Sequence, residues 1–250
     1  MLCHIDSGRA AFGRNVGAAL SGDVGHKGCA LQERCLCAAF PRRDERMIPS
    51  YGRTVRARRT VYRAGDDLSG ALVICRGWAL RFVQFPNGKR QVLSIVLPGQ
   101  LASPTLLLDR KLPFSIQAVT EVACAYIPFA DIHDRFRSDP AWLDLWLGMA
   151  AADRRSADQQ LINIGRRSAF GRIAALIAAI CEILVRQSAI DENGVFEFPL
   201  TQRQIADAAA LTPVHTCRIV RQLRAANICD IGNGKVRIID FARLQDAASA

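Results

Sequence analysis

The residues best suited to chemistry lie near the C-terminal end, where arginines recur at helical spacing. Arg218, Arg221 and Arg224 follow one another at intervals of three residues, so a helix would carry them on one broad face. A guanidinium group can donate two parallel hydrogen bonds to a guanine edge, and it also pairs with phosphate. The segment begins with Thr212-Pro213, a hydroxyl N-cap followed by the residue preferred at the first helical position. These residues predict a helix over residues 213–226 with a basic outer face.

Two neighbouring elements must position that helix. Thr201 and Gln204 form a capping-box pattern, which opens a preceding helix over residues 202–210. A Gly-Asn-Gly turn at residues 232–234 follows and joins two short apolar runs, which predicts a β-hairpin. Side chains at i, i+3, i+4 and i+7 of the basic helix define its inward face, namely Thr216, Ile219, Val220 and Leu223. Two short helices and a trailing hairpin predict a winged helix-turn-helix, whose second helix is sized for the major groove of DNA.

The predicted DNA contacts follow from this arrangement. The start and the outer face of the second helix would meet bases and backbone, and a lysine in the hairpin would meet a phosphate. The predicted DNA-binding residues are Thr212, Pro213, Val214, His215, Cys217, Arg218, Arg221 and Lys235. The alternative is an effector-binding or protein-interaction module whose winged helix does not read DNA, and the basic outer face argues against it.

The overall composition agrees with a polyanionic partner. The chain has 250 residues, half of them hydrophobic, and a formal net charge of +10, which favours nucleic acid. Its nine cysteines are odd in number and scattered, so they do not form a disulfide framework. Charged residues interrupt the N-terminal 25 residues, and the longest apolar stretch is too short for a membrane span. We therefore expect a protein of the reducing cytoplasm with no membrane contact.

Sequence motifs give no support for catalysis. The four histidines are scattered along the chain. The chain has no Walker loop, serine-hydrolase elbow, zinc-protease motif or dinucleotide fingerprint. The chain is therefore predicted not to be an enzyme.

The N-terminal half has the periodicity of β-structure. Between about residues 60 and 130, short runs rich in β-branched and aromatic residues alternate with glycine turns, among them Asn87-Gly88. The run Ile116–Ile127 is expected to form one further strand. Many short strands separated by such turns predict a β-sandwich or β-roll.

The middle of the chain has the periodicity of helices. Apolar residues after Pro140 predict one long helix over residues 140–164, and a second apolar helix is predicted over residues 169–186. The stripe of the long helix includes Trp142 and Trp146 and needs a partner. A second copy of the helix, the chain's own β domain, or both at different points would supply one.

The predicted fold class is thus α+β. The chain divides into a cysteine-containing extension (1–40), a sensory β-roll (41–135), a dimerisation helix (136–168) and a winged helix-turn-helix (169–250).

Several stretches resemble the Crp–Fnr family, named after the cyclic-AMP receptor protein and the fumarate–nitrate regulator. The resemblance is carried by Tyr62–Asp67, Ile74–Trp78, Gly88–Leu93, Leu97–Gln100, Tyr126–Phe129, Gly165–Ala174, Leu200–Asp207 and Leu211–Arg224. It implies a cyclic-nucleotide-binding-like β-roll, a homodimer, and a roughly palindromic operator with one recognition helix in each half-site. It also implies a transcription activator or repressor that works with RNA polymerase.

By position, Arg218 corresponds to the family's recognition-helix arginine, which reads a guanine. The sequence departs from the family pattern at Val214, where the well-studied members usually carry glutamate, and at Pro213. The operator is therefore expected to differ from the standard one.

The family's cyclic-nucleotide cassette pairs a glutamate with the ribose and an arginine with the phosphate. Here Gly99-Gln100 lacks the glutamate, and Pro113 and Phe114 lie near the position of the arginine. Losing that bidentate arginine is not a conservative change. Binding of a cyclic nucleotide is therefore not expected, and the chain resembles more closely the branch of the family that does not use cyclic nucleotides.

A second sensory option is an iron–sulfur cluster. His26, Cys29 and Cys35 have the spacing of the N-terminal ligands in the oxygen-sensing branch, with Cys37 as a spare thiolate. The fourth ligand would be Cys124, which lies one residue before the matching position. The alternatives are a zinc or thiol-redox site, or no metal at all. The other cysteines in apolar surroundings are expected as core residues: Cys75, Cys181 and Cys229.

Overall fold

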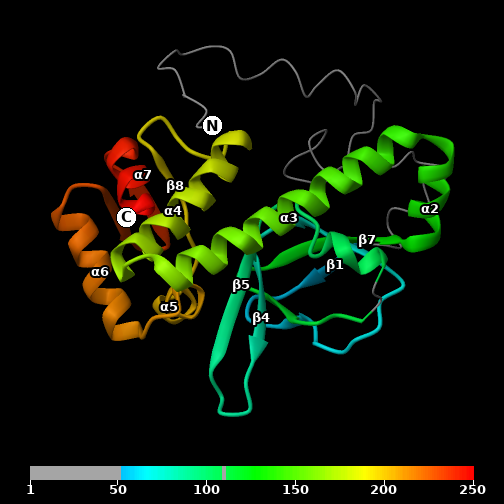
Figure 1. Ribbon diagram of the computed structural model, residues 1–250, viewed down its shortest axis with the longest axis horizontal. Helices are drawn as coiled ribbons and strands as arrows, with labels where there is room; N and C mark the ends of the chain where they lie inside the picture. Colours follow the sequence, from blue (N-terminus) through cyan, green and yellow to red (C-terminus); the bar gives the residue numbers. More distant parts are fainter. Residues whose placement is uncertain (1–51, 109–110) are drawn as a thin grey trace.

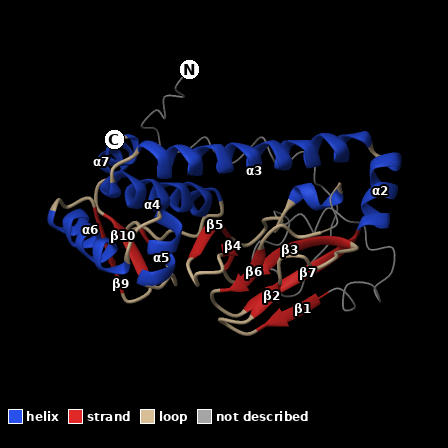
Figure 2. Ribbon diagram, turned by 60° about the horizontal axis from the view of Figure 1, so that its bottom comes forward, coloured by secondary structure: helices blue, strands red, loops and turns tan. Residues whose placement is uncertain are grey.

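The computed structural model describes residues 52–108 and 111–250. These residues form a β domain and a C-terminal domain of helices with a small sheet. One long helix, α3, runs alongside both (Figures 1 and 2). This arrangement confirms the predicted α+β fold, with an N-terminal roll, a long helix and a C-terminal winged helix-turn-helix.

The β domain is built from two antiparallel sheets. One sheet has the order β1-β7-β3 and the other has the order β2-β6-β4-β5. The elements are β1 (Gly52–Val55), β2 (Thr60–Tyr62), β3 (Gly70–Arg76), β4 (Ala79–Gln84), β5 (Arg90–Val96), the 3-10 helix η4 (Pro104–Leu107), β6 (Ser115–Ala118) and β7 (Val122–Pro128). β4 and β5 form a long hairpin that projects from the domain at the predicted Asn-Gly turn (Figure 1).

The single strand predicted over Ile116–Ile127 is wrong, because β6 and β7 belong to different sheets. Thr120 turns the chain between them: its hydroxyl accepts a hydrogen bond from the N–H of Trp78 at 2.9 Å. Gly77, next to that tryptophan, has φ +81°, and a Cβ there would lie 2.0 Å from the Glu121 carbonyl oxygen. Only glycine permits this close approach, so the crossing depends on a contact between two separate segments.

Two helices follow the roll, α2 (Phe129–Ser138) and α3 (Pro140–Arg166). The Asp139 side chain caps α3 by accepting a hydrogen bond from the Ala141 N–H at 3.2 Å, and a proline occupies the first turn. Trp142 and Trp146 are 5% and 3% exposed and belong to the core of the roll. The tryptophans of the predicted stripe therefore pack against the chain's own β domain.

The C-terminal domain contains the predicted helix-turn-helix and a three-stranded sheet. Its sheet has the order β8-β10-β9. The elements are α4 (Ala169–Arg186), β8 (Val195–Glu197), α5 (Gln202–Ala209), α6 (Pro213–Ala225), β9 (Cys229–Gly232), β10 (Lys235–Ile238) and α7 (Phe241–Ser249). The apolar helix predicted over 169–186 is confirmed as α4.

The two domains share a core. Side chains on the outer face of β4, Leu80 and Phe82, cluster with residues of α4, α6 and the small sheet. Trp78 meets Phe198 edge to face, with ring centroids 6.2 Å apart. Packing of the winged helix against the roll therefore fixes the position of one domain relative to the other.

Candidate nucleic-acid interface

Local hydrogen bonds fix where the two helices of the motif begin. α5 begins with a capping box, in which Thr201 Oγ1 accepts from the Gln204 N–H at 3.2 Å and Gln204 Oε1 accepts from the Thr201 N–H at 2.8 Å. α5 ends at Ala209, and its C-cap residue, Ala210, has a left-handed backbone. α6 begins directly afterwards, where the Thr212 hydroxyl accepts from the His215 N–H at 3.2 Å. The capping box and the Thr-Pro start predicted from the sequence are confirmed.

The inward face of α6 packs as predicted. Thr216, Ile219 and Leu223 are at most 4% exposed, and Val220 is half-buried. The hydroxyl oxygen of Thr216 is buried without a hydrogen-bond partner among the described residues. This packing turns the opposite face of α6 to solvent.

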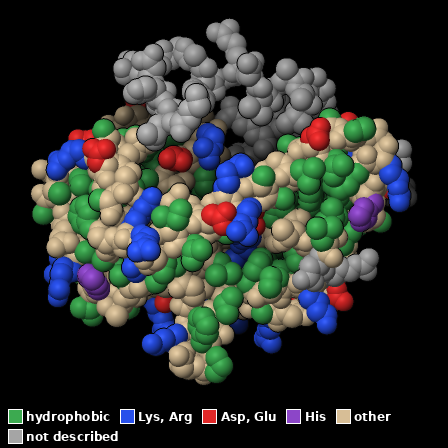
Figure 3. All heavy atoms as spheres, viewed as in Figure 1, with side chains coloured by type: hydrophobic (Ala, Val, Ile, Leu, Met, Phe, Trp, Pro, Cys, Tyr) green, Lys and Arg blue, Asp and Glu red, His purple; other side chains and the backbone are tan. Residues whose placement is uncertain are grey.

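The structure brings the predicted DNA-binding residues of α6 together on that outer face. Cys217 is half-buried, at the edge between the two faces. The others are exposed: Thr212, Pro213, Val214, His215, Arg218 and Arg221. Within the described part of the chain, the guanidinium groups of Arg218 and Arg221 make no hydrogen bond or ion pair. Lys and Arg side chains are visible on this side of the domain, at the left of Figure 3.

Arg224, the third arginine of the series, differs from the other two. Its Nε donates to Asp230 Oδ1 at 2.6 Å and its Nη2 donates to the Ile231 carbonyl at 3.2 Å. Both acceptors lie on β9. Arg224 therefore ties the end of α6 to the hairpin.

The hairpin β9–β10 forms the wing. Its turn has two successive left-handed residues, Asn233 (φ +53°) and Gly234 (φ +73°), as a tight hairpin turn of type I′ requires. Lys235 follows the turn and is exposed, with its Nζ 3.4 Å from Glu197 Oε1 of β8. That ion pair is open to water on both sides, so Lys235 can exchange it for a phosphate.

Inside the roll, a buried arginine joins β4 to α3 and lies beside Phe114. Arg81 is 8% exposed, and its two terminal nitrogens lie 2.7 and 3.3 Å from the carboxylate oxygens of Asp153 on α3. Arg81 also donates to the Ala102 carbonyl at 3.1 Å and lies 5.1 Å from the ring centre of Phe114. Phe114 thus packs on a guanidinium group that is already satisfied by a carboxylate.

Both domains match known families in the predicted order. Residues 52–139 match the cyclic nucleotide-binding domain, and residues 171–247 match the Crp-like helix-turn-helix domain. The chain belongs to the Crp–Fnr family. It is a transcription regulator of that type, with a helix-turn-helix DNA-binding domain at its C-terminal end.

Relatives of this Crp–Fnr protein cover nearly its whole length. The transcriptional activator protein FnrL of Cereibacter sphaeroides is 24% identical over 88% of this chain and 90% of its own. The nitrogen fixation regulation protein FixK of Bradyrhizobium diazoefficiens is 23% identical over 89% and 93%. These relatives confirm the predicted likeness to the branch of the family that does not use cyclic nucleotides.

The fold also matches that of a solved regulator. The structure of FixK2 from Bradyrhizobium japonicum has a TM-score of 0.70 at 19% identity, covering 80% of this chain and 97% of that one. At this identity the likeness shows the fold alone.

The predicted metal ligands of this Crp–Fnr regulator fall mostly outside the described residues. His26, Cys29, Cys35 and Cys37 lie there. Cys124 is described: it is 3% exposed, and its Sγ donates to the Arg53 carbonyl at 3.2 Å. Burial raises the pKa of this thiol to about 11, and a bound metal ion would lower that pKa again, because a metal coordinates the thiolate. The role of Cys124 as a cluster ligand stays a prediction, because the other predicted ligands lie outside the described residues.

The described residues contain no group of three or more His, Cys, Asp or Glu side chains placed to hold a metal ion. Cys181 and Cys229 are buried as predicted, and Cys75 is half-buried. None of the helices formed by the described residues is both long and apolar enough to cross a membrane.

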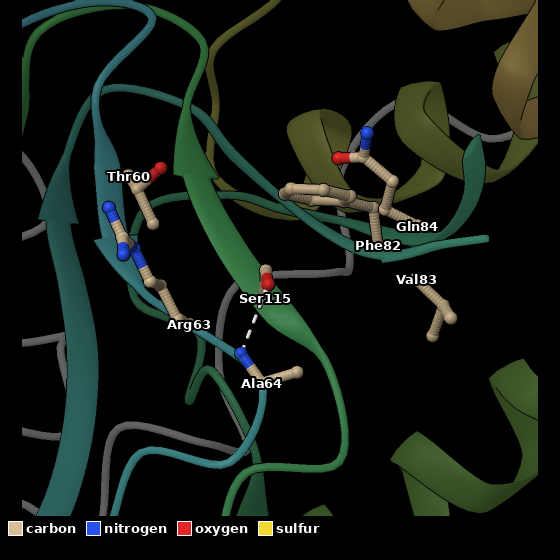
Figure 4. A pocket seen from close by; sticks show the side chains of 7 residues that line it. All are labelled: Thr60, Arg63, Ala64, Phe82, Val83, Gln84 and Ser115. Atoms are coloured by element: carbon tan, nitrogen blue, oxygen red, sulfur yellow. Dashed lines mark hydrogen bonds between the residues drawn. The ribbon is translucent and has the colours of Figure 1, made fainter. Parts of the chain in front are cut away.

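A hollow of about 320 Å³ lies on the roll, beside β2, β4 and β6 (Figure 4). It is lined by Thr60, Arg63, Ala64, Phe82, Val83, Gln84 and Ser115. The Ser115 hydroxyl accepts a hydrogen bond from the Ala64 N–H at 3.0 Å, so it is already engaged. The lining combines no nucleophile with a base.

The sequence reasoning missed the ion pairs that hold the domains together. Arg81 and Asp153 are 72 residues apart in the chain. Arg90 on β5 donates to Asp207 on α5 at 3.0 Å, across 117 residues. Neither pair has a signal in local spacing, because the partners meet only in the folded chain.

Proposed function

We propose that two copies of this chain bind a roughly palindromic double-stranded DNA site as a homodimer and thereby regulate transcription. The observation that carries this proposal is the outer face of α6, where Arg218 and Arg221 are exposed and have no partner within the described residues. An exposed guanidinium group keeps its water until a ligand replaces it. Each protomer would place one α6 in the major groove, with the wing beside the flanking phosphates.

The residues of this face divide into those that read bases and those that position the helix. Arg218 faces a base pair and donates two hydrogen bonds to a guanine, while Arg221 and Lys235 meet phosphates. Val214 is 75% exposed in the first turn of α6, where an apolar side chain suits a thymine methyl group. The smaller contributions come from Thr212, Pro213, His215 and Cys217.

The dimer would form along α3, which carries two stripes offset by one residue. The inner stripe packs against the rest of the chain and includes the two buried tryptophans. The second stripe faces outward and repeats at intervals of four and three residues. This outer stripe consists of Leu143, Leu147, Ala150, Arg154, Ala157, Leu161 and Ile164. Leu147 and Leu161 are 56% and 73% exposed. A repeat of 3.5 residues is the spacing that pairs two helices in a coiled coil.

RNA polymerase is the further partner that this role requires. The relative FnrL is named a transcriptional activator, and this supports an activating role at promoters where the dimer lies beside the polymerase.

The proposal extends to the signal that controls the regulator. Redox sensing would rest on the N-terminal residues His26, Cys29, Cys35 and Cys37, with Cys124 buried as described. Protein purified without oxygen would show a charge-transfer absorption near 400 nm with stoichiometric iron and sulfide. A colourless, iron-free protein that still binds DNA would remove the cluster and leave the DNA-binding role intact.

The test of DNA binding begins with an operator selected from random duplexes by the full-length protein. Arg218→Ala should weaken binding to that operator by roughly 1–3 kcal/mol and relax the base preference at one position in each half-site. Fluorescence anisotropy on the operator and on its single-base variants measures both effects.

Arg243→Ala is the matched control, because Arg243 is an exposed arginine on α7, away from α6. It removes the same charge and should leave the base preference unchanged. Selection of no sequence, together with no salt dependence of binding, would instead favour a winged helix that contacts protein, because phosphate contacts release counterions.

A further inference from the structure

One position of the outer stripe breaks its apolar pattern. Arg154 lies at its centre, with small or branched apolar residues on both sides. In the single chain it pairs with Asp158 at 2.8 Å, and the two side chains are 78% and 51% exposed. Such an exposed pair within one helix is weak. Arg154 is therefore free to take another partner when the stripe is covered.

The covering partner follows from the proposed function, on which this inference rests. DNA binding by a two-fold dimer needs both winged helices at the same end of the assembly. α3 has 27 residues and is thus about 40 Å long, so an antiparallel pair would separate the two winged helices by that length. The two α3 helices must therefore run parallel, with each Arg154 near its equivalent in the other protomer.

In a parallel coiled coil, a central side chain packs into a hole formed by four residues of the facing helix. One of those four immediately precedes the equivalent central position. For Arg154 this neighbour is Asp153 of the partner subunit. An arginine at a central position can thus reach an acidic side chain at the flank of the interface.

Hydrogen bonds from Arg81 orient the Asp153 carboxylate for such a contact. The carboxylate accepts two hydrogen bonds from Arg81, at 2.7 and 3.3 Å, and the Asp153 side chain is 28% exposed. Arg81 is fixed in turn by Ser94 and by the Ala102 carbonyl. The carboxylate therefore has a set orientation and still reaches the surface beside the outer stripe.

We infer that Arg154 pairs with Asp153 of the partner subunit in the dimer, so that Arg81 inside the roll positions a contact across the α3 interface. A change that displaces Arg81 inside one roll therefore releases Asp153 of that protomer and weakens the contact of this carboxylate with Arg154 of the other protomer. The roll and the dimer interface are linked through two side chains, without movement of the helix as a whole.

The experiment measures the dimer dissociation constant of the full-length protein by sedimentation equilibrium. Arg154→Glu places a second carboxylate beside Asp153 of the partner subunit. This repulsion should raise the dimer dissociation constant at least about tenfold at low salt. The increase should shrink in about 1 M NaCl, where charges are screened within a few ångströms. Arg155→Glu is the matched control, because Arg155 is exposed and lies outside the stripe. Equal effects of the two substitutions would overturn the inference.

A second pair of variants tests the link to the roll. Arg81→Lys keeps the charge but loses the two-pronged contact with Asp153. It should raise the dissociation constant several-fold in the wild-type background and have no further effect when Arg154 is already alanine. Equal effects of Arg81→Lys in both backgrounds would show that Arg81 acts on folding alone and would overturn the link.

Leu161→Asp separates this inference from the proposed dimer. Leu161 belongs to the outer stripe and carries no charge, so its replacement by aspartate should produce monomers. A Leu161→Asp protein that stays dimeric, or a wild-type protein that is monomeric, would overturn the α3 dimer itself. Monomers with Leu161→Asp, together with equal effects of the two arginine substitutions, would overturn only the Arg154 contact.

Discussion

Arginine serves different purposes in the roll and in the recognition helix. Arg81 and Arg90 are largely buried and are bound to carboxylates of other elements. Arg218 and Arg221 are exposed and have no partner within the described residues. Because a buried charge is costly unless an opposite charge and hydrogen bonds satisfy it, the roll arginines are committed to the fold. Of these four arginines, Arg218 and Arg221 are the two that are available to a ligand.

The committed arginines also explain why the two domains form one unit. Arg90 pairs with Asp207 of α5 and also donates to Gln117 of β6 at 2.9 Å. Gln160 of α3 donates to the Ala208 carbonyl of α5 at 2.7 Å. The first helix of the helix-turn-helix thus faces the roll and α3, and this leaves α6 as the helix that faces outward.

The strongest test of this comparison is to remove one arginine of each kind. Arg81→Ala leaves Asp153 without its main partner and should lower the free energy of unfolding by about 3 kcal/mol, the lower end for a broken buried pair. The lower end applies because Asp153 is 28% exposed. Arg218→Ala should stay within about 0.5 kcal/mol of the wild type, as surface substitutions do.

Urea unfolding of both variants, followed by circular dichroism, measures these free energies. A loss of under about 1 kcal/mol for Arg81→Ala would mean that water screens the pair as it screens a surface ion pair. The distinction between committed and available arginines would then fail.

The buried thiol of Cys229 makes the stability of the fold depend on alkaline pH. Burial, reinforced by the nearby Asp230, raises the pKa of Cys229 to about 12, against about 8.5 in an unfolded chain. The folded state therefore keeps a proton that the unfolded state loses. The stabilisation is complete below about pH 8.5 and is lost as the pH rises toward 12.

Between about pH 8.5 and 12, the Cys229 thiol contributes a slope of about −1.4 kcal/mol per pH unit to the free energy of unfolding. Cys229→Ala should make the measured slope shallower by about that amount, whatever it does to stability at pH 7. Urea unfolding between pH 8 and 11 gives both slopes. An unchanged slope would show that Cys229 is not a neutral core group in the folded state.

The sequence predicts the recognition helix well because its signals are local. The Thr201–Gln204 box and the Thr212 cap are bonds between residues three apart in the chain. The inward face of α6 follows from a helical period, and the wing turn follows from two residues that tolerate left-handed backbone. Each of these signals lies within one turn of the element that it specifies.

The roll and the domain contacts are harder to predict because their determinants meet only in the folded chain. The break between β6 and β7 depends on Trp78, some forty residues earlier. β8 has only three residues and exists because β10 pairs with it. The sequence therefore separates roll from winged helix, but it cannot indicate the core that the two domains share.

Arg224 lies on the recognition helix but is paired with a carboxylate of its own chain, as the roll arginines are. Its ion pair with Asp230 is exposed by 56% and 35%, so losing it should cost at most about 1 kcal/mol of operator affinity. If Arg224 positions the wing, Arg224→Ala and Asp230→Asn should weaken operator binding to the same extent, since both break the same pair. The slope of log affinity against log salt should then stay unchanged.

A phosphate contact by Arg224 would give a different pattern. Arg224→Ala would reduce the salt slope by about one unit, while Asp230→Asn would bind as tightly as the wild type or more tightly because it removes a negative charge. Anisotropy titrations of the two variants at several salt concentrations separate these outcomes. Suppose that both variants lose the same operator affinity and keep the wild-type salt slope. An ion pair with a carboxylate of the same chain, and not location on α6, then decides whether an arginine of this protein is available to DNA.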